Sequence, residues 1–310
     1  PNAEEIQIVA KLYWPNGAQR GLDEERTIPA FGRIYESVTE LFSLVNTEQV
    51  SDGFVWVEAD GPGAIGFELI ELEDTAIGLN AQTPNNATTL YSAQLGHAVD
   101  LFTDLKLVNT TDDLVQLTVT LVFQNESLGT RVARPSLLSK QTFQNDIGSW
   151  FGIPLPPEPA VGSIKVEATV PGIVGDVLFG DRNSARNAAA LPLQSQLFTL
   201  ALHSQVANGQ DPSDPSNGQF TGLALFNPNP ENAEVLIEVF DRDGELVGDA
   251  AVILGPARRI SNTLVELVPE SAGLVRGYIV IQSDLPIVGQ ELFGNNGLDY
   301  MAAVPPEIIE

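Results

Sequence analysis

Residues 53–69 read GFVWVEADGPGAIGFEL, and this stretch decides the fold because the chain repeats its pattern twice more. The pattern recurs as GSIKVEATVPGIVGDVL at 162–178 and as GYIVIQSDLPIVGQEL at 277–292. In every copy a glycine opens an apolar run and a proline follows nine residues later, at Gly53/Pro62, Gly162/Pro171 and Gly277/Pro286. The copies are spaced by 109 and 115 residues. We interpret each copy as a pair of strands joined by a turn at the proline, and the spacing predicts an internal repeat.

Two further landmarks keep the same register upstream of each copy. Apolar residues at positions i, i+4 and i+7 predict one short helical turn per copy. These triplets are Ile34-Val38-Leu41, Phe143-Ile147-Trp150 and Ile260-Leu264-Leu267. Twenty or twenty-one residues before each triplet an aromatic residue ends a predicted strand, at Tyr13, Phe123 and Phe240. Because independent landmarks agree across the copies, the chain is predicted to be a threefold repeat.

The second and third copies share opening strands that the first copy lacks. FTDLKLVN at 102–109 matches FTGLALFN at 220–227, and LYSAQLGHAV at 90–99 matches LFTLALHSQV at 197–206. Pro1 lies only a few residues before the first aromatic strand, so the first copy is short of about two strands.

Three domains follow from these matches. We expect an incomplete β-sandwich repeat at 1–86, a second repeat at 87–193 and a third at 194–310. We expect Pro1 to be the first residue of a processed product or of an excised fragment. We expect the tail at 303–310 to lie where a fourth copy would begin.

The fold class follows from the length and patterning of the strands. Each copy of about 110 residues contains short strands with period-2 alternation, as in Thr118-Thr120-Val122. One helical turn per copy excludes a βαβ architecture, and the period is too long for a propeller blade. We therefore predict an all-β protein made of three tandem β-sandwiches, and its short linkers predict a stiff rod.

The charge balance limits the possible partners. The sequence has 41 acidic and 15 basic residues, a formal net charge of −26. Such a surface argues against nucleic acid and anionic lipid as partners, because both need basic residues. There is no cysteine and no apolar run long enough to span a membrane. Excess carboxylate with little lysine favours a secreted or cell-surface location.

The third copy carries a resemblance to a known group. FTGLALFNPNPENAEVLIEVFDRDGELVG, followed by NTLVEL and GYIVIQSDLPIVGQELFG, resembles the tandem immunoglobulin-like β-sandwich repeats of secreted and surface bacterial proteins. The resemblance implies a structural, adhesive or spacer role. Its motifs describe a fold, so no catalytic residue is carried over from it.

Candidate metal ligands are few. Asp241, Asp243 and, further on, Asp249 resemble the start of a calcium loop, but the glycine and glutamate that complete such a loop are missing. A hairpin turn is the main interpretation of this segment. His97 and His203 fall at nearly equivalent places, which favours strand-end residues inherited by duplication. No cofactor is expected.

Two tryptophans are the candidates for a sugar-binding platform. Trp14 lies at a predicted turn, and Trp56 alternates with Phe54 along a strand. The other copies carry Lys165 and Val280 at the position of Trp56, so a repeated platform is not supported.

The leading hypothesis from the sequence is a non-catalytic extracellular structural protein. No nucleophile, base and orienting group form a set, so we predict that the chain is not an enzyme. The strands missing from repeat 1 would come from an upstream segment or from a neighbouring chain, and the second route gives a head-to-tail filament. An adhesive stalk belongs to the same class. The alternative is a carbohydrate- or protein-binding accessory module of a larger secreted protein.

Overall fold

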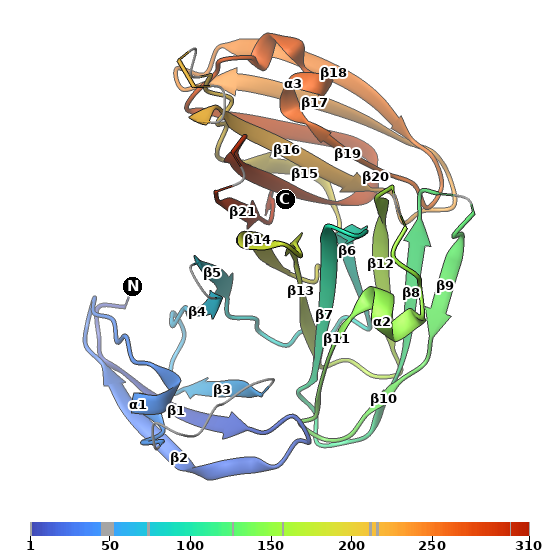
Figure 1. Cartoon of the computed structure of the whole chain (residues 1–310). Coiled ribbons are helices and arrows are strands. Elements are labelled where there is room, and N and C mark those ends of the chain that lie inside the picture. The colour runs from blue at the N-terminus through green and yellow to red at the C-terminus, as the bar shows by residue number, and fades with distance from the viewer. Residues whose placement is uncertain are drawn as a thin grey trace.

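The protein is an all-β molecule, as the sequence predicted (Figure 1). The computed structural model describes residues 2–44, 53–72, 75–125, 127–156, 158–210, 213–214, 217–297 and 299–309. We call the three predicted repeats unit 1, unit 2 and unit 3. The helices among the described residues are short: α1 (Val38–Leu41), α2 (Ile147–Phe151), α3 (Leu264–Leu267) and the 3-10 turn η2 (Pro269–Ser271).

The three predicted helical turns are confirmed, one in each unit. Ser37 and Thr263 begin α1 and α3 with a capping box, in which the side chain accepts from the backbone N–H of Glu40 or Glu266 and that glutamate accepts from the cap N–H. Asp146 caps α2 by accepting from the N–H of Ser149. The first residue of each apolar triplet precedes its helix, so the helical part is shorter than the apolar spacing suggested.

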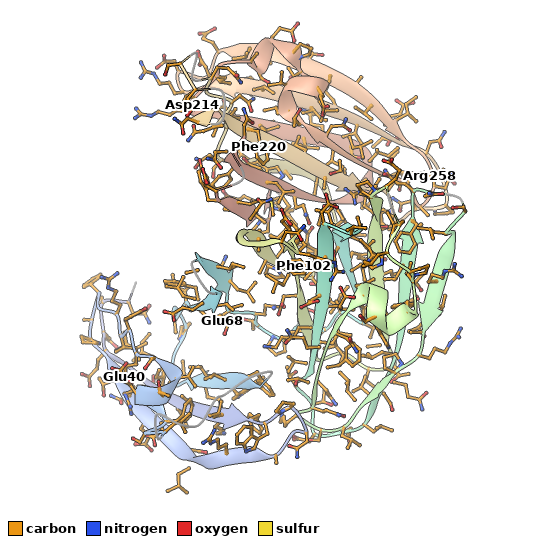
Figure 2. All side chains as sticks on the ribbon, viewed as in Figure 1. Glu40, Glu68, Phe102, Asp214, Phe220 and Arg258 are labelled. Atoms are coloured by element: carbon orange, nitrogen blue, oxygen red, sulfur yellow. The ribbon has the colours of Figure 1, made fainter. Side chains whose placement is uncertain are left out.

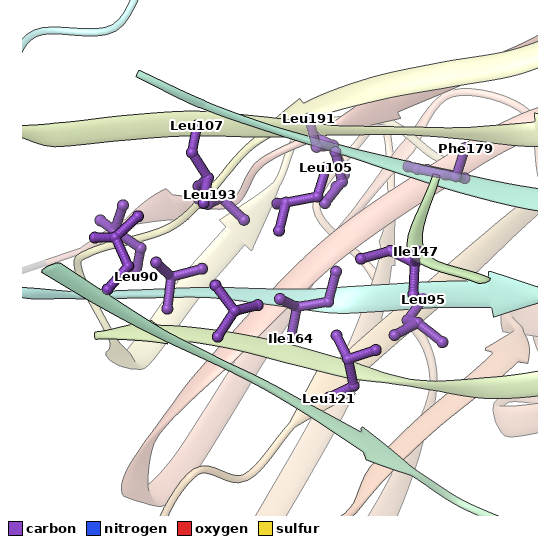
Figure 3. Close-up of a cluster of buried hydrophobic side chains, with 14 of the residues drawn as sticks. Leu90, Leu95, Leu105, Leu107, Leu121, Ile147, Ile164, Phe179, Leu191 and Leu193 are labelled. Carbon is purple, nitrogen blue, oxygen red and sulfur yellow. The ribbon is translucent and has the colours of Figure 1, made fainter. Parts of the chain in front are cut away.

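Unit 2 is a two-sheet sandwich. One sheet has the order β10-β8-β12-β6, with β9 also paired to β8, and the other has the order β11-β7-β13-β14. The strands are β6 (Thr89–His97), β7 (Leu101–Asn109), β8 (Val115–Phe123), β9 (Thr130–Ala133), β10 (Ser136–Leu137), β11 (Thr142–Asp146), β12 (Ala160–Ala168), β13 (Ile173–Asp181) and β14 (Ser184–Pro192). Leucine, isoleucine and phenylalanine side chains from both sheets fill the space between them (Figure 3). Alternation of apolar residues along each strand places one face of each sheet in this core.

Unit 3 repeats this plan with one change. Its first sheet has the order β18-β17-β20-β15-β22, and its second sheet joins β19, β16, β20 and β21. The strands are β15 (Phe198–His203), β16 (Gln219–Phe226), β17 (Ala233–Asp241), β18 (Leu246–Leu254), β19 (Arg259–Thr263), β20 (Gly277–Asn295), β21 (Met301–Val304) and β22 (Glu307–Ile308). The strand β20 pairs with β17 along its first part and with β16 along its second, so one strand belongs to both sheets.

The repeated glycine–proline motif is a crossing between sheets, and our interpretation of it as a hairpin was wrong. In unit 2 the strands on either side of Pro171 are β12 and β13, which lie in different sheets and do not pair with each other. In unit 3 the same segment is the continuous strand β20. Alternation of apolar residues shows that a segment is a strand, but it does not show which strand pairs with it, and here the partners lie far along the chain.

Unit 1 is built from a small sheet and a separate hairpin. The sheet has the order β2-β1-β3, and the hairpin is β4-β5. The bounds are β1 (Ile6–Tyr13), β2 (Gln19–Ile28), β3 (Phe54–Ala59), β4 (Phe67–Leu72) and β5 (Thr75–Asn80). Ile77 and Leu79 of β5 pack against Ala188 and Ala190 of β14 in unit 2. Figure 1 accordingly shows the hairpin beside β14 and apart from the sheet of unit 1.

The units follow an arc rather than the straight rod that the short linkers predicted (Figure 1). Unit 2 lies at the back of the arc, and units 1 and 3 form its two arms. The free ends of both arms lie on the open side.

Candidate functional site

The most distinctive surface of the molecule is the open side of unit 1. In unit 2 the strand β12 lies between β8 and β6, and β13 lies between β7 and β14. Their counterparts in unit 1 are β3 and β4, yet among the described residues β3 pairs only with β1 and β4 only with β5. Unit 1 therefore has two unpaired strand edges, at the places that the opening strands β6 and β7 occupy in unit 2.

Apolar side chains are exposed next to these edges. Val57 on β3 is 53% exposed, and Ile65, which precedes β4, is 94% exposed. Phe67 and Leu69 on one face of β4 are 64% and 48% exposed. An unpaired edge flanked by exposed apolar side chains is a template for strand addition.

The joint between units 2 and 3 contains a buried arginine. Arg259, at the start of β19 in unit 3, is 4% exposed and reaches into unit 2. Its Nη1 donates to the carbonyl oxygens of Leu95 at 3.2 Å and Gly162 at 2.6 Å, and its Nη2 lies 3.5 Å from Oε1 of Gln94. Burial lowers the pKa of Arg259 to about 10, so the guanidinium stays charged at neutral pH. Carbonyl oxygens of unit 2 thus hold a cation of unit 3 without a carboxylate.

Apolar and polar contacts complete this joint. Ala93 of unit 2 packs with Ala224, Phe226 and Val288 of unit 3 in one buried cluster. Gln194, the first residue of unit 3, pairs with Tyr91 of unit 2 and donates to the carbonyl oxygen of Gly289 within unit 3 at 2.7 Å. Figure 2 shows the labelled Arg258, next to Arg259, where unit 3 meets unit 2.

Residues 140–142 of unit 2 make the joint between units 1 and 2. The backbone N–H of Thr142 donates to the carbonyl oxygen of Pro15 at 3.0 Å. The ammonium of Lys140 lies 5.2 Å from the centre of the Trp56 ring. Thr142 and Arg259 each lie two residues after a residue with a left-handed backbone, at Lys140 (φ 54°) and Ala257 (φ 53°). Both joints are therefore made by the same part of the repeat.

Asp241 ends β17, Asp243 lies in the turn between β17 and β18, and Asp249 lies on β18. Oδ1 of Asp241 accepts from the backbone N–H groups of Asp243 at 2.9 Å and Glu245 at 3.0 Å, which is a turn closed by an aspartate. Asp249 lies on β18 opposite Glu238. Within the described ranges, no group of three or more histidine, aspartate or glutamate side chains is placed to hold a metal ion.

Both candidate tryptophans carry a cation against the ring. The guanidinium of Arg20 lies 4.4 Å from the ring centre of Trp14, and Lys140 lies over Trp56. The indole N–H of Trp56 donates to Glu58 at 2.9 Å. The structure places Trp56 in the joint with unit 2, while Trp14 lies at the turn where β1 ends.

The two histidines are not equivalent, contrary to our alignment. Ile164 and Ile279 both lie two residues after the repeated glycine, and they pair with Ser92 and His203 respectively. His203 therefore corresponds to Ser92, while His97 pairs further along, opposite Ala160. The pairing register of β6 with β12 also shifts by one residue between Gly162 and Ile164, where an irregularity interrupts the ladder.

Sequence reasoning missed two buried carboxyl groups. Asp176 on β13 is 8% exposed, and burial raises its pKa to about 7, with Glu68 of unit 1 adding to the effect and Lys106 opposing it. Glu291 faces His203 inside unit 3 at 3.4 Å, and burial raises the pKa of Glu291 while His203 opposes this. Neither position has a sequence signal, because burial depends on the partner sheet.

No helix in the described part of the chain is long and apolar enough to cross a membrane. The sequence matches no family model and no curated protein.

Three solved structures show a weak likeness to this chain. The crystal structure of Thermotoga maritima 1070 is 18% identical, with 35% of this chain and 91% of that chain covered and a TM-score of 0.29. A β-glucuronidase from glycoside hydrolase family 2 is 9% identical, with 72% and 24% covered and a TM-score of 0.17. A glycosyl hydrolase family 2 member from Bacteroides cellulosilyticus DSM 14838 is 9% identical, with 75% and 32% covered and a TM-score of 0.16. The chain spans about a quarter to a third of the two glycoside hydrolase chains, and at these TM-scores none of the likenesses assigns an activity.

Proposed function

We propose that this protein is a non-catalytic structural component, secreted or on the cell surface, that works by assembly. In this proposal unit 1 is an acceptor for two added β-strands, one beside β3 and one beside β4. The observation that carries it is the pair of unpaired edges in a unit whose counterparts are complete sandwiches.

The energetics support strand addition at this surface. Burying a Val, Leu, Ile or Phe side chain stabilises a complex by about 1.5 to 3 kcal/mol, and four such side chains are exposed along the two edges. Added strands would also satisfy the backbone groups along β3 and β4. The sequence of unit 1 also supports strand addition, because the segment from β3 to β4 keeps the repeated glycine–proline pattern of the complete units.

The sugar-binding alternative gains no support from the tryptophans. A basic side chain lies over one face of each ring and would compete with a sugar for that face. The acidic surface fits an assembly that stays soluble in saline surroundings, since a large net charge limits non-specific association.

A peptide that carries the missing type of strands tests the proposal. Synthetic peptide 89–109 contains β6 and β7 of unit 2, and we expect it to bind the 310-residue chain in a one-to-one complex that native mass spectrometry and fluorescence anisotropy detect. Val57→Asp and Phe67→Asp place charges at exposed positions along the acceptor edges and should abolish binding.

The matched control is Leu22→Asp, on the other edge strand of the same sheet, at a position that is 83% exposed. This variant should bind the peptide as the unchanged protein does. Binding no tighter than that of a scrambled peptide, or binding that survives Val57→Asp and Phe67→Asp, would overturn strand addition at unit 1.

A further inference from the structure

The three units share a tight turn that the sequence comparison did not reveal. Its third residue has a left-handed backbone, at Phe31 (φ 55°), Lys140 (φ 54°) and Ala257 (φ 53°). A backbone hydrogen bond closes each turn: Gly32 to Pro29 at 2.8 Å, Gln141 to Leu138 at 3.1 Å and Arg258 to Gly255 at 3.1 Å. Non-glycine residues rarely adopt this conformation, so its recurrence marks equivalent positions. We call these the docking turns.

Two of the three docking turns contact the preceding unit. The turn of unit 2 holds Pro15 and Trp56 of unit 1 through Thr142 and Lys140. The turn of unit 3 is followed by Arg259, which the carbonyl oxygens of unit 2 hold, and Nη1 of Arg258 lies 3.4 Å from the carbonyl oxygen of Gln124.

Among the described residues, no other unit contacts the docking turn of unit 1 as units 1 and 2 contact the other two turns. Phe31 is 74% exposed, and Arg33, the counterpart of Arg259, is exposed and forms no hydrogen bond or ion pair with a described residue. The position that Thr142 and Arg259 occupy is buried in the two formed joints, and on unit 1 it is exposed.

The distribution of basic residues points the same way. The chain has only 15 basic residues against 41 acidic ones. Nevertheless each docking turn carries a basic residue at its tip or directly after it: Arg33, Lys140, and Arg258 with Arg259. In the two formed joints these cations contact carbonyl oxygens or an aromatic ring.

The end of unit 3 that lies away from unit 2 resembles the end of unit 1 that contacts the docking turn of unit 2. Tyr13 and Phe54 stack at 4.9 Å at the end of unit 1 that receives unit 2, and Phe240 and Tyr278 stack at 5.0 Å at the equivalent end of unit 3. Both ring pairs are nearly parallel, with an interplanar angle of 9°. Acidic side chains at Asp243 and Glu245 lie on the turn beyond this stack, which favours a cationic partner.

A pocket at this end corresponds to the place where Arg259 binds. The cavity has a volume of about 390 Å³, and its lining includes Ser204, Gln205, Gly277 and one basic residue, Arg276. Gly277 is the counterpart of Gly162, and the bridge between Ala207 and Val275 places Gln205 opposite Gly277, as Leu95 lies opposite Gly162.

We propose that the docking turn of unit 1 binds the free end of unit 3 of a second copy, with Arg33 in this pocket. This contact between two molecules would have the same arrangement as the joints between units within one molecule. It is head-to-tail. Repetition gives a ring if the arc closes and a helical filament if it does not. The inference rests on the proposed role in assembly, but it uses a different surface from the unpaired edges.

Cysteine cross-linking tests this contact directly, because the chain has no cysteine. Gly17 lies against the backbone of Ser139 in the first joint, and the counterparts of this pair are Gly244 and Ala30. We chose Ala30→Cys, and Asp243→Cys because Gly244 has a left-handed backbone (φ 85°). A mixture of the two single variants should give a disulfide-linked dimer under mild oxidation, in at least about tenfold excess over either variant alone.

A second pair is the control. Leu22→Cys is as exposed as the docking turn but lies on β2, and with Asp243→Cys it should give no excess of dimer. Arg33→Glu introduced into the Ala30→Cys variant should reduce the dimer to the control level. A dimer yield in the Ala30→Cys and Asp243→Cys mixture no higher than in the control would overturn the contact, as would a yield that Arg33→Glu leaves unchanged.

The two proposals fail separately. Arg33→Glu should leave binding of peptide 89–109 intact, because Arg33 lies outside β3 and β4. Cross-linking without peptide binding would uphold the head-to-tail contact and overturn strand addition. Peptide binding without cross-linking would uphold strand addition and overturn the head-to-tail contact.

Discussion

A single buried asparagine holds the loops at a strand end in unit 2 and again in unit 3. Asn109 and Asn227 are fully buried at the ends of β7 and just after β16. The amide of Asn109 donates to the carbonyl oxygens of Asp113, Leu137 and Leu138. That of Asn227 donates to Glu231, Leu254 and Gly255 in the same arrangement. One side chain thus ties two loops to a strand end in both complete units.

Removing this amide should destabilise a unit. Asn227→Ala leaves one buried and two partly buried carbonyl oxygens without their donor, and we expect the free energy of unfolding to fall by about 2 to 4 kcal/mol. Urea denaturation followed by circular dichroism measures the change, because the three tryptophans lie in units 1 and 2 and do not report on unit 3. Asn232→Ala, at an exposed position nearby, serves as the control and should shift stability by less than about 0.5 kcal/mol.

Asp176 should make the contact between units 1 and 2 sensitive to pH. Its pKa is raised from 3.8 to about 7, so the protonated carboxyl stabilises the fold fully below about pH 4, and this contribution is lost as the pH rises through about 7. At about 1.4 kcal/mol per pKa unit the loss amounts to about 4 kcal/mol at most.

Asp176→Asn tests this expectation, because the amide cannot ionise. The variant should gain stability at pH 8 and gain little at pH 4, and the slope of melting temperature against pH should become flatter between these values. An unchanged slope would show that Asp176 ionises freely in the folded protein.

The position of the strands could be predicted from the sequence, but their pairing could not. Gly53, Gly162 and Gly277 mark the start of β3, β12 and β20 within a residue or a few. The alternation in Thr118-Thr120-Val122 also lies within β8 as expected. Whether the next strand joins the same sheet depends on residues about 60 or more positions away, and no local pattern records that choice.

The candidate site was partly predictable for a similar reason. Counting strands in each repeat indicated the unpaired edges of unit 1. The contacts of Arg259 were not predicted, because an arginine at the start of a strand has the same local pattern whether it is solvated or buried in a neighbour. The only available signal was the pair Arg258-Arg259 in a chain with few basic residues.

Arg259 is expected to stiffen the joint between units 2 and 3. Arg259→Ala removes a buried cation and its hydrogen bonds to Leu95 and Gly162, so the two units should move more freely. Small-angle X-ray scattering should show a broader distribution of distances, and the melting temperature should fall by several degrees, about 2 to 4 °C per kcal/mol lost.

The control for this prediction is Arg242→Ala. Arg242 is an exposed side chain paired only loosely with Asp243 at 3.5 Å, at the far end of unit 3. Scattering curves that coincide for Arg259→Ala and Arg242→Ala would show that the arginine does not hold the joint.

At the scale of the whole molecule, net charge should oppose assembly. Each 310-residue chain carries a formal charge of −26, so two chains repel each other at low salt. Raising the ionic strength from about 0.01 M to about 1 M shortens the Debye length from about 30 Å to about 3 Å, and association should increase. Light scattering against salt concentration measures this, and association that weakens with salt would show that attraction between opposite charges dominates.

The unbroken strand β20 has a mechanical consequence. In unit 3 both sheets hold the same strand, whereas in unit 2 the short segment 169–172 links β12 to β13. A load that slides one sheet past the other can be taken up by that segment in unit 2, but in unit 3 it must break the hydrogen-bond ladder of β20 with β17 or with β16. In single-molecule pulling, unit 3 should therefore yield at the higher force, and the arc should extend first through its middle.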